Sequence, residues 1–221
     1  MSFFKSVNNI LFRGENICLF CKESMESSSN YICTSCMEFV EVVNREIKLD
    51  KPYIEKAYYS VLYNRLIRKK LHQFKFQGQS YLYKAFGEML VNTIKAKGLQ
   101  KEIDVITFVP IHRRKKALRG YNQSELLGVY VAKKLDIPLI KNHLIKAKWT
   151  LDQNKLGKVQ RKTNLKDSFK VKNAEDLKGK EILLIDDIIT TGATLGECGK
   201  VLMGKGAKRV YGLALTSSTK V

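Results

Sequence analysis

The sequence predicts an α/β protein in which a parallel sheet is flanked by helices and preceded by a small cysteine-rich module. Strand-like and helix-like segments alternate through the second half of the chain. One of these strands, "EILLID", runs into a loop rich in Thr and Gly, and four of the five cysteines form two C-x-x-C pairs near the N-terminus. Strands separated by helices favour a parallel sheet, whose ligands bind at the carboxyl ends of the strands.

The length of the chain, 221 residues of which 44% are hydrophobic, favours one main domain with a sizeable core and a small appendage. No run approaches the roughly 18 to 20 apolar residues of a membrane-spanning helix. The N-terminus also lacks a long apolar segment with a cleavage site. We therefore expect a cytoplasmic protein without a transmembrane segment.

The charge of the chain is strongly basic, with 40 Lys and Arg against 21 Asp and Glu, a formal net charge of +19. Residues 1–50 hold 5 basic and 7 acidic residues, so residues 51–221 carry +21. Such an excess favours anionic partners such as phosphates, nucleic acid or acidic membrane. A Lys-rich proteome would give the same surplus without a specific partner.

The cysteine pairs predict a metal site. Eleven residues separate the second cysteine of one pair from the first of the next, and a chain without a secretory signal favours metal ligands over disulfides. Four thiolates form a closed tetrahedral zinc site with a structural role, whereas a redox pair or an iron centre are the alternatives. The predicted ligands are Cys18, Cys21, Cys33 and Cys36. The fifth cysteine, Cys198, falls in a predicted helix as a small buried thiol.

The order of the elements divides the chain in two. Residues 37–47 show helical spacing and, with the cysteine module, form a unit over 1–50 that ends at an Asp-Lys-Pro cluster. The second unit, 51–221, contains the sheet. Its predicted strands cover residues 53–63, 103–110, 137–145, 180–186 and 209–218, and its helices cover 64–78, 80–98, 121–135 and 193–206. A basic loop is expected at 111–120, and a long functional or mobile loop at about 146–168.

The stretch "ILLIDDIITTGAT" at 182–194 contains the candidate ligand-binding residues. Its apolar start has no alternation, as in a central parallel strand, so Asp186 and Asp187 emerge at the carboxyl edge. The Thr/Gly turn at 190–194 opens the next helix, where backbone N–H groups bind phosphate. Two carboxylates repel a bare anion, but they accept hydrogen bonds from sugar hydroxyls or help to hold a divalent ion. A phosphorylated ribose meets both demands.

These 13 residues closely resemble the phosphoribosyl pyrophosphate (PRPP) signature of type I phosphoribosyltransferases. The resemblance implies a type I phosphoribosyltransferase-like sheet that binds PRPP with Mg²⁺. In that family the acid pair meets the ribose diol and the Thr/Gly loop holds the 5-phosphate. The residues that the resemblance assigns to the ligand are Asp186, Asp187, Thr190, Thr191, Gly192, Ala193 and Thr194.

Nearly the whole chain resembles the ComF family of competence-associated proteins. Beside the signature and the cysteine pairs, the matching segments are "LIRKKLHQFKFQG", "VPIHRRKKALRGYNQ" and "LDQNKLGKVQRKTNLKDSF". The family implies a role in natural transformation, in which incoming single-stranded DNA is handled at the cytoplasmic side of the inner membrane, with a DNA-uptake helicase or channel protein as partner. Two alternatives remain: a phosphoribosyltransferase acting on an unknown acceptor, and a ligand-sensing DNA-binding regulator or adaptor.

Two further loops are candidates for contacts with pyrophosphate. The loop after the strand at 103–110 offers backbone and cations, unless it is merely a solvated basic loop. Its candidate residues are Val109, Pro110, Ile111, His112, Arg113 and Arg114. The loop at 146–168 resembles the flap of type I enzymes that closes over pyrophosphate. Its matching residues include Gln153 and Arg161, and Arg161 is the candidate catalytic residue.

A third basic segment, 63–76, interleaves Lys and Arg with Tyr63, Phe74 and Phe76. Such a pattern grips the backbone of single-stranded DNA and stacks its bases. The aromatic residues also fall at helical spacing with Leu and Ile, which favours a place in the core.

Overall fold

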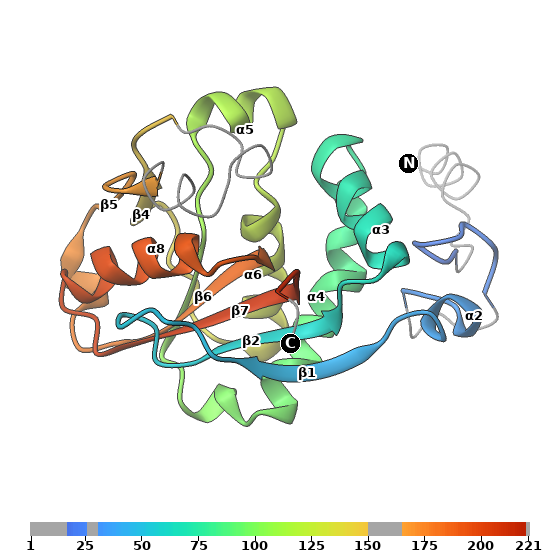
Figure 1. Cartoon of the computed structure of the whole chain (residues 1–221), viewed down its shortest axis with the longest axis horizontal. Helices are drawn as coiled ribbons and strands as arrows, with labels where there is room; N and C mark the ends of the chain where they lie inside the picture. The colour runs from blue at the N-terminus through green and yellow to red at the C-terminus, as the bar shows by residue number, and fades with distance from the viewer. Residues whose placement is uncertain (1–16, 26–30, 150–164, 220–221) are drawn as a thin grey trace, which may run out of the picture.

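The computed structural model describes residues 17–25, 31–149 and 165–219. Its centre is a five-stranded sheet with the strand order β1-β2-β7-β6-β3 (Figure 1). Strand β1 is antiparallel to β2, and the other neighbours are parallel, which confirms the predicted α/β class with a mostly parallel sheet. The strands are β1 (Val42–Ile47), β2 (Ala57–Leu62), β3 (Val105–Phe108), β6 (Glu181–Ile189) and β7 (Arg209–Ser217).

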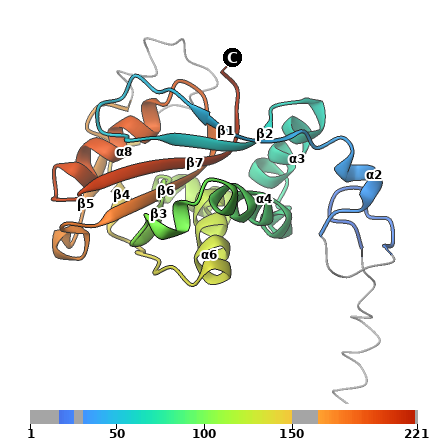
Figure 2. The same cartoon turned by 90° about the horizontal axis from the view of Figure 1, so that it is seen from below.

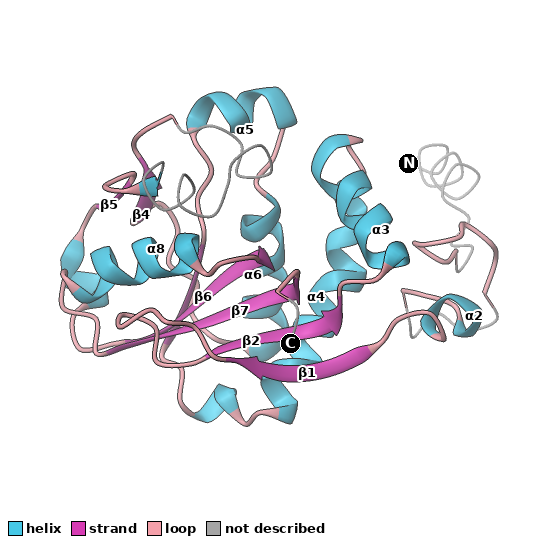
Figure 3. Cartoon of the chain, in the orientation of Figure 1, coloured by secondary structure: helices cyan, strands magenta, loops and turns pink. Residues whose placement is uncertain are grey.

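Helices cover both faces of this sheet (Figure 2). Helices α4 (Tyr83–Ala96) and α6 (Gln123–Leu135) pack on one face, and α8 (Ala193–Met203) packs on the other. The remaining elements, coloured by type in Figure 3, are α2 (Thr34–Met37), α3 (Arg65–Phe76), α5 (Arg113–Arg119), the hairpin of β4 (Leu144–Lys146) with β5 (Phe169–Val171), and the 3-10 turns η1 (Ser80–Leu82), η2 (Leu99–Lys101) and η4 (Ala174–Leu177).

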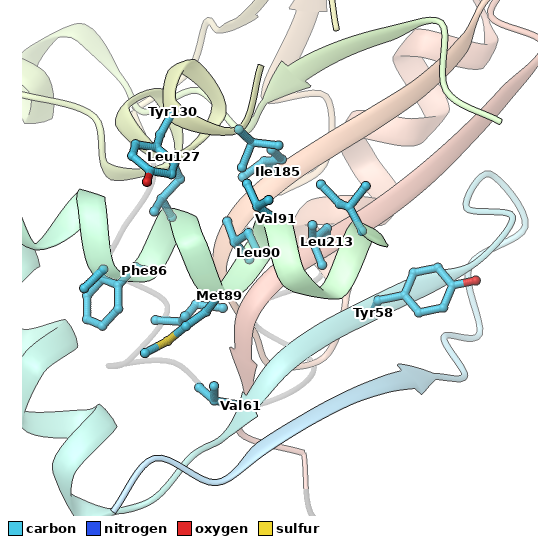
Figure 4. Close-up of a cluster of buried hydrophobic side chains, with 14 of the residues drawn as sticks. Tyr58, Val61, Phe86, Met89, Leu90, Val91, Leu127, Tyr130, Ile185 and Leu213 are labelled. Carbon is cyan, nitrogen blue, oxygen red and sulfur yellow. The ribbon is translucent and has the colours of Figure 1, made fainter. Parts of the chain in front are cut away.

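The apolar runs of β6 and β7 supply both halves of the core. Along β6, Leu183 and Ile185 face α4 and α6, whereas Ile182 and Leu184 face the side of α8. Figure 4 shows the first cluster, in which Leu90 of α4 and Leu127 of α6 lie beside Ile185. A strand that is buried on both faces must be apolar at every position, and this explains the continuous pattern of the sequence.

The prediction of a helix over residues 37–47 is wrong. Only the four-residue helix α2 forms before it, and residues 42–47 are strand β1, whose Glu46 and Ile47 pair with Tyr58 and Ala57 of β2. The apolar spacing of so short a segment fits either structure, and the unpaired edge of β2 decides between them. Because β1 belongs to the sheet, the sheet begins before residue 50. The predicted domain boundary at that residue stays a prediction.

The basic loop predicted at 111–120 contains a helix instead, α5. His112 caps its start, since the ring Nδ1 accepts a hydrogen bond from the backbone N–H of Arg114. Gly120 ends the helix with a left-handed backbone, φ 83°. An almost wholly polar sequence gave no apolar stripe from which to predict it.

The strand predicted at 137–145 is reduced to β4 and to a bridge between Leu139 and Ile106. Strands β4 and β5 pair at the base of the long loop, of which residues 150–164 lie outside the described part of the chain. The other predicted strands and helices are confirmed, with small shifts at their ends. In the described residues, none of the helices has the length and apolar character needed to cross a membrane.

Candidate functional site

The four predicted metal ligands come together in the N-terminal module. The Sγ atoms of Cys18, Cys21, Cys33 and Cys36 all lie within 4.8 Å of one another, and all four are free thiols. The Sγ atoms of Cys21 and Cys33 are 3.7 Å apart. A tetrahedral ion with metal–sulfur bonds of about 2.3 Å separates its ligands by roughly 3.8 Å. The four cysteines are therefore placed to hold one metal ion with the coordination of a closed structural site.

Backbone N–H groups surround these sulfurs. The N–H groups of Phe20 and Cys33 donate to the Sγ of Cys18, at 3.4 and 3.3 Å, and that of Cys36 donates to the Sγ of Cys33. Burial opposes ionisation of Cys18, but the backbone donors outweigh it and lower the pKa of this thiol from 9.0 to about 6. Cys18 is thus prepared to be a thiolate, which is the form that binds metal. The pKa of Cys36 is instead raised by burial and by hydrogen bonds with the neighbouring thiols, and that of Cys21 is also raised.

The acid pair lies where β6 extends beyond its neighbour. The pairing of β3 with β6 ends at Phe108 and Ile185, so Asp186 and Asp187 have no strand beside them on the β3 side. The Oδ1 of Asp186 accepts hydrogen bonds from the Oγ of Ser124, at 3.0 Å, and from the backbone N–H of Asp187, at 2.8 Å. Burial and the adjacent charge of Asp187 raise the pKa of Asp186 to about 7.

The second carboxylate of the pair has a cation as its partner. The Nζ of Lys75, near the end of α3, lies 2.7 Å from the Oδ1 of Asp187. Both side chains are largely buried. Charge pairing in such a place is stronger than at the surface, because less water screens it. The acid pair is therefore held in two ways, by a hydroxyl at Asp186 and by an ammonium group at Asp187.

The Thr/Gly turn connects this edge to α8. Gly192 has a left-handed backbone, φ 69°, and a Cβ atom there would lie 2.9 Å from the side chain of Leu49, so only Gly fits without strain. The carbonyl of Thr190 accepts a hydrogen bond from the Thr219 hydroxyl, and that of Ile189 accepts one from the N–H of Ser218. The turn is thus fixed to the end of β7, with the positive end of α8 behind it.

The loop after β3 forms the other wall. The backbone N–H of Val109 donates to the carbonyl of Ile185, and the Nδ2 of Asn122 donates to the carbonyl of Val109 at 3.0 Å. Asn122 also caps α6 through its Oδ1. Asn122 therefore starts α6 and also holds this loop beside the acid pair.

A cleft of about 160 Å³ lies between these parts. Its lining includes both acids, Ser124, three residues of the β3 loop, and several cations. The lining residues are Lys75, Phe76, Val109, Pro110, Ile111, Lys115, Arg119, Gln123, Ser124, Lys146, Phe169, Asp186, Asp187, Ile188, Thr190 and Thr194. A larger hollow of about 500 Å³ adjoins it and shares Pro110, Ile111 and Lys146 in its lining.

The predicted site residues are distributed over the cleft, the adjoining Thr/Gly turn and the larger hollow. The acid pair, Thr190, Thr194 and the loop from Val109 to Ile111 meet in the cleft, and Thr191, Gly192 and Ala193 complete the adjoining turn. His112 and Arg113 line the larger hollow instead, and Arg114 is exposed on α5. Gln153 and Arg161 lie outside the described residues. The roles predicted for all of these residues remain predictions.

The two side chains that contact the carboxylates of the acid pair, Lys75 and Ser124, are among the lining residues that the sequence did not predict. Lys75 appeared only in a basic segment proposed for DNA, and Ser124 gave no signal at all. Of the three aromatic residues in that segment, Phe74 lies in the core, as the helical spacing predicted. Tyr63 and Phe76 are exposed, so for these two the stacking of DNA bases stays a prediction. Cys198 is buried, as expected.

The fold and the cleft define a class: a protein with a phosphoribosyltransferase-like α/β domain. The family model described as "Phosphoribosyl transferase domain" matches residues 122–216, which contain α6, β6, α8 and β7. Its span thus includes the acid pair and the Thr/Gly turn, but not the cysteine module.

Known proteins narrow the class. The chain is 28% identical to Competence protein F of Haemophilus influenzae, over 89% of this chain and 96% of that protein. It is 27% identical to Competence protein ComFC of Bacillus subtilis, over 87% and 80%. It is also 31% identical to the DNA utilization protein YhgH of Escherichia coli, over 63% and 62%. Over most of its length the chain is thus similar to competence-associated proteins of the ComF family.

Proposed function

We propose that this protein binds PRPP together with Mg²⁺ in the cleft beside Asp186 and Asp187, and that it acts in DNA uptake. The observation that carries the proposal is the meeting of an acid pair, a Thr/Gly turn at a helix N-terminus and several cations around one cleft. PRPP presents sugar hydroxyls, a monophosphate and a diphosphate. Each of these groups has a chemical counterpart in the cleft.

The proposed contacts follow from this chemistry. The ribose hydroxyls donate hydrogen bonds to the two carboxylates, and the 5-phosphate accepts them from backbone N–H groups of the turn at 190–194. The diphosphate lies toward the β3 loop and the side of the cleft that carries Lys115, Arg119 and Lys146. Mg²⁺, when bound with the ligand, neutralises part of the diphosphate charge.

Calorimetric titration of PRPP with and without Mg²⁺, with ribose 5-phosphate as the reference ligand, tests this proposal. Metal-dependent binding that is clearly tighter than that of ribose 5-phosphate is expected. Asp186→Asn with Asp187→Asn should weaken it about 100-fold or more, because each amide keeps an acceptor oxygen but loses the charge that strengthens its hydrogen bonds to the ligand. Asp167→Asn with Asp176→Asn removes the same two charges from exposed positions and should change nothing. Equal affinity of all three proteins would exclude the acid pair from the binding site.

Transfer of ribose 5-phosphate to an acceptor is the enzymatic form of the proposal. The bond between ribose C1 and the diphosphate breaks, a bond between C1 and the acceptor forms, and the diphosphate leaves. Arg161 and Gln153 of the long loop keep their predicted roles in this step. Release of pyrophosphate in the presence of an acceptor distinguishes a transferase from a ligand-sensing regulator or adaptor, which binds without turnover.

The metal of the cysteine module is proposed to be zinc, because four thiolates in tetrahedral geometry favour it. Metal analysis of the purified protein should give one zinc per chain. Cys33→Ser should release it and loosen the packing of the module. A protein that contains iron instead, or no metal, contradicts the assignment.

The competence role rests on the relatives named Competence protein F and ComFC. We propose the same process for this chain, at the cytoplasmic side of the membrane and beside a DNA-uptake helicase or channel protein. Single-stranded DNA is the proposed polymer ligand. Phe76 is 54% exposed at the edge of the cleft, between the His72 ring at 5.1 Å and the Arg119 guanidinium at 5.0 Å. Exposed aromatic rings beside cations suit the stacking of unpaired bases.

A further inference from the structure

Helix α3 contacts both candidate sites of the protein. Lys70 is buried, with 7% of its surface exposed, and its Nζ donates a hydrogen bond to the carbonyl of Phe20 in the cysteine module. The neighbouring turn of the same helix carries Lys75, whose Nζ pairs with Asp187 in the cleft. One rigid element thus joins the cysteine module to the acid pair.

Aromatic packing follows the same route. The ring of Phe20 packs edge-on against Phe86 of α4, with centroids 5.9 Å apart, and Phe86 packs in the same way against Phe74 of α3, at 5.5 Å. Phe74 in turn contacts Tyr121, at 5.9 Å. Phe20, Phe74 and Phe86 are each buried. A displacement of the cysteine module therefore cannot leave α3 in place without opening this packing.

The position of Lys75 determines whether the Asp187 carboxylate has a charged partner. With Lys75 present, one carboxylate oxygen of Asp187 is paired and the side chain has a fixed partner. Without it, two carboxylates stand next to each other in a largely buried place with less compensation, and like charges repel. An acid pair that is to receive ribose hydroxyls in a set geometry needs such support.

We propose that Lys75 is a positioning residue of the acid pair, and that the cysteine module sets its place through α3. This inference rests on the proposed binding of PRPP in the cleft. On this proposal the cysteine module supports the ligand site without contacting the ligand.

The role of Lys75 is tested by substitution, with PRPP affinity measured by calorimetry. Lys75→Met should weaken binding about tenfold or more, and Lys75→Arg should restore much of it, because a guanidinium group also pairs with the carboxylate. Lys84→Met removes the same charge from an exposed position on α4 and should leave the affinity unchanged. Lys75→Arg that binds as weakly as Lys75→Met would overturn the positioning role.

A double-mutant cycle then tests the route. Lys70→Met removes the hydrogen bond from α3 to the Phe20 carbonyl but keeps all four cysteines. It should weaken PRPP binding severalfold in the wild-type background and less than about twofold when Lys75 is already Met. Independent effects, in which the two losses of affinity multiply, would show that the module does not act through Lys75.

A measurement without PRPP separates this inference from the proposed function. Amide hydrogen exchange is followed in the metal-loaded protein and after removal of the metal by a chelator. Lost protection in α3 and at residues 186–190, with α8 beyond its first turn unchanged, supports the coupling even if PRPP fails to bind. Unchanged protection in α3 and at 186–190 overturns the coupling, even if PRPP binds as proposed.

Discussion

The Asp186 carboxyl lies in the cleft, and its ionisation there lowers the stability of the fold. Its pKa is raised to about 7 by burial and by the neighbouring charge of Asp187, while Lys75 and Ser124 act in the opposite direction without cancelling this. The unfolded carboxyl has a pKa near the ordinary value of 3.8. Between these two values the folded protein binds more protons than the unfolded chain, so its stability falls as the pH rises.

Asp186→Asn should therefore stabilise the ligand-free protein at neutral and higher pH. An amide keeps an oxygen that accepts hydrogen bonds from Ser124 and from the backbone of residue 187, but it carries no charge. We expect the variant to lie within about 1 kcal/mol of the wild type near pH 4 and to exceed it by on the order of 4 kcal/mol at pH 8. Thermal or urea unfolding across this range measures the difference. A difference that does not change with pH would contradict a raised pKa.

At the scale of elements, the end of α3 is tied to the start of α6. Helix C-termini leave carbonyl groups without partners inside the helix. The carbonyl of Phe74 accepts hydrogen bonds from the hydroxyl of Tyr121 and from the Nε2 of Gln123, and the Oε1 of Gln123 accepts one from Arg119 at 2.6 Å. The segment "RGYNQS" thus fixes α3, the β3 loop and Asp186 with consecutive side chains.

Tyr121→Phe removes only the hydroxyl from this junction. Because Gln123 still donates to the Phe74 carbonyl, the loss should be about 1 kcal/mol, or a fall of roughly 2 to 4 °C in Tm for a chain of this size. PRPP affinity should stay within about twofold, since the packing of the ring is kept. Gln123→Ala serves as the stronger comparison, because it removes contacts to both Phe74 and Arg119. If Tyr121→Phe were as stable as the wild type, the hydroxyl would add nothing at this junction.

At the scale of the whole molecule, charge is the dominant property. The net charge of +19 is concentrated after residue 50, and two of the helices beside the cleft, α3 and α5, are strongly basic. A polyanion therefore meets a favourable field around the cleft, and cations released from its phosphates favour binding.

Binding of single-stranded DNA should weaken steeply with salt. Between about 50 and 200 mM salt, several phosphate contacts would lower the affinity by roughly 100-fold or more. Fluorescence anisotropy with a labelled oligonucleotide gives the slope of log K against log salt. Phe76→Ala should lower the affinity at every salt concentration without changing the slope, because it removes stacking and no charge. Binding that is insensitive to salt would rule out a phosphate-led contact.

The sequence by itself determined the fold class, the main parallel strands, the two cysteine pairs and the acid pair at the end of β6. Local sequence patterns predict these features: continuous apolar runs, C-x-x-C spacing and a Thr/Gly turn. Only the tertiary structure decided that residues 42–47 form a strand, because an open sheet edge overrides an ambiguous pattern. It also decided that Lys75 meets Asp187 and that Ser124 meets Asp186. Contacts between elements distant in the chain depend on how helices pack on the sheet, and no local spacing records that.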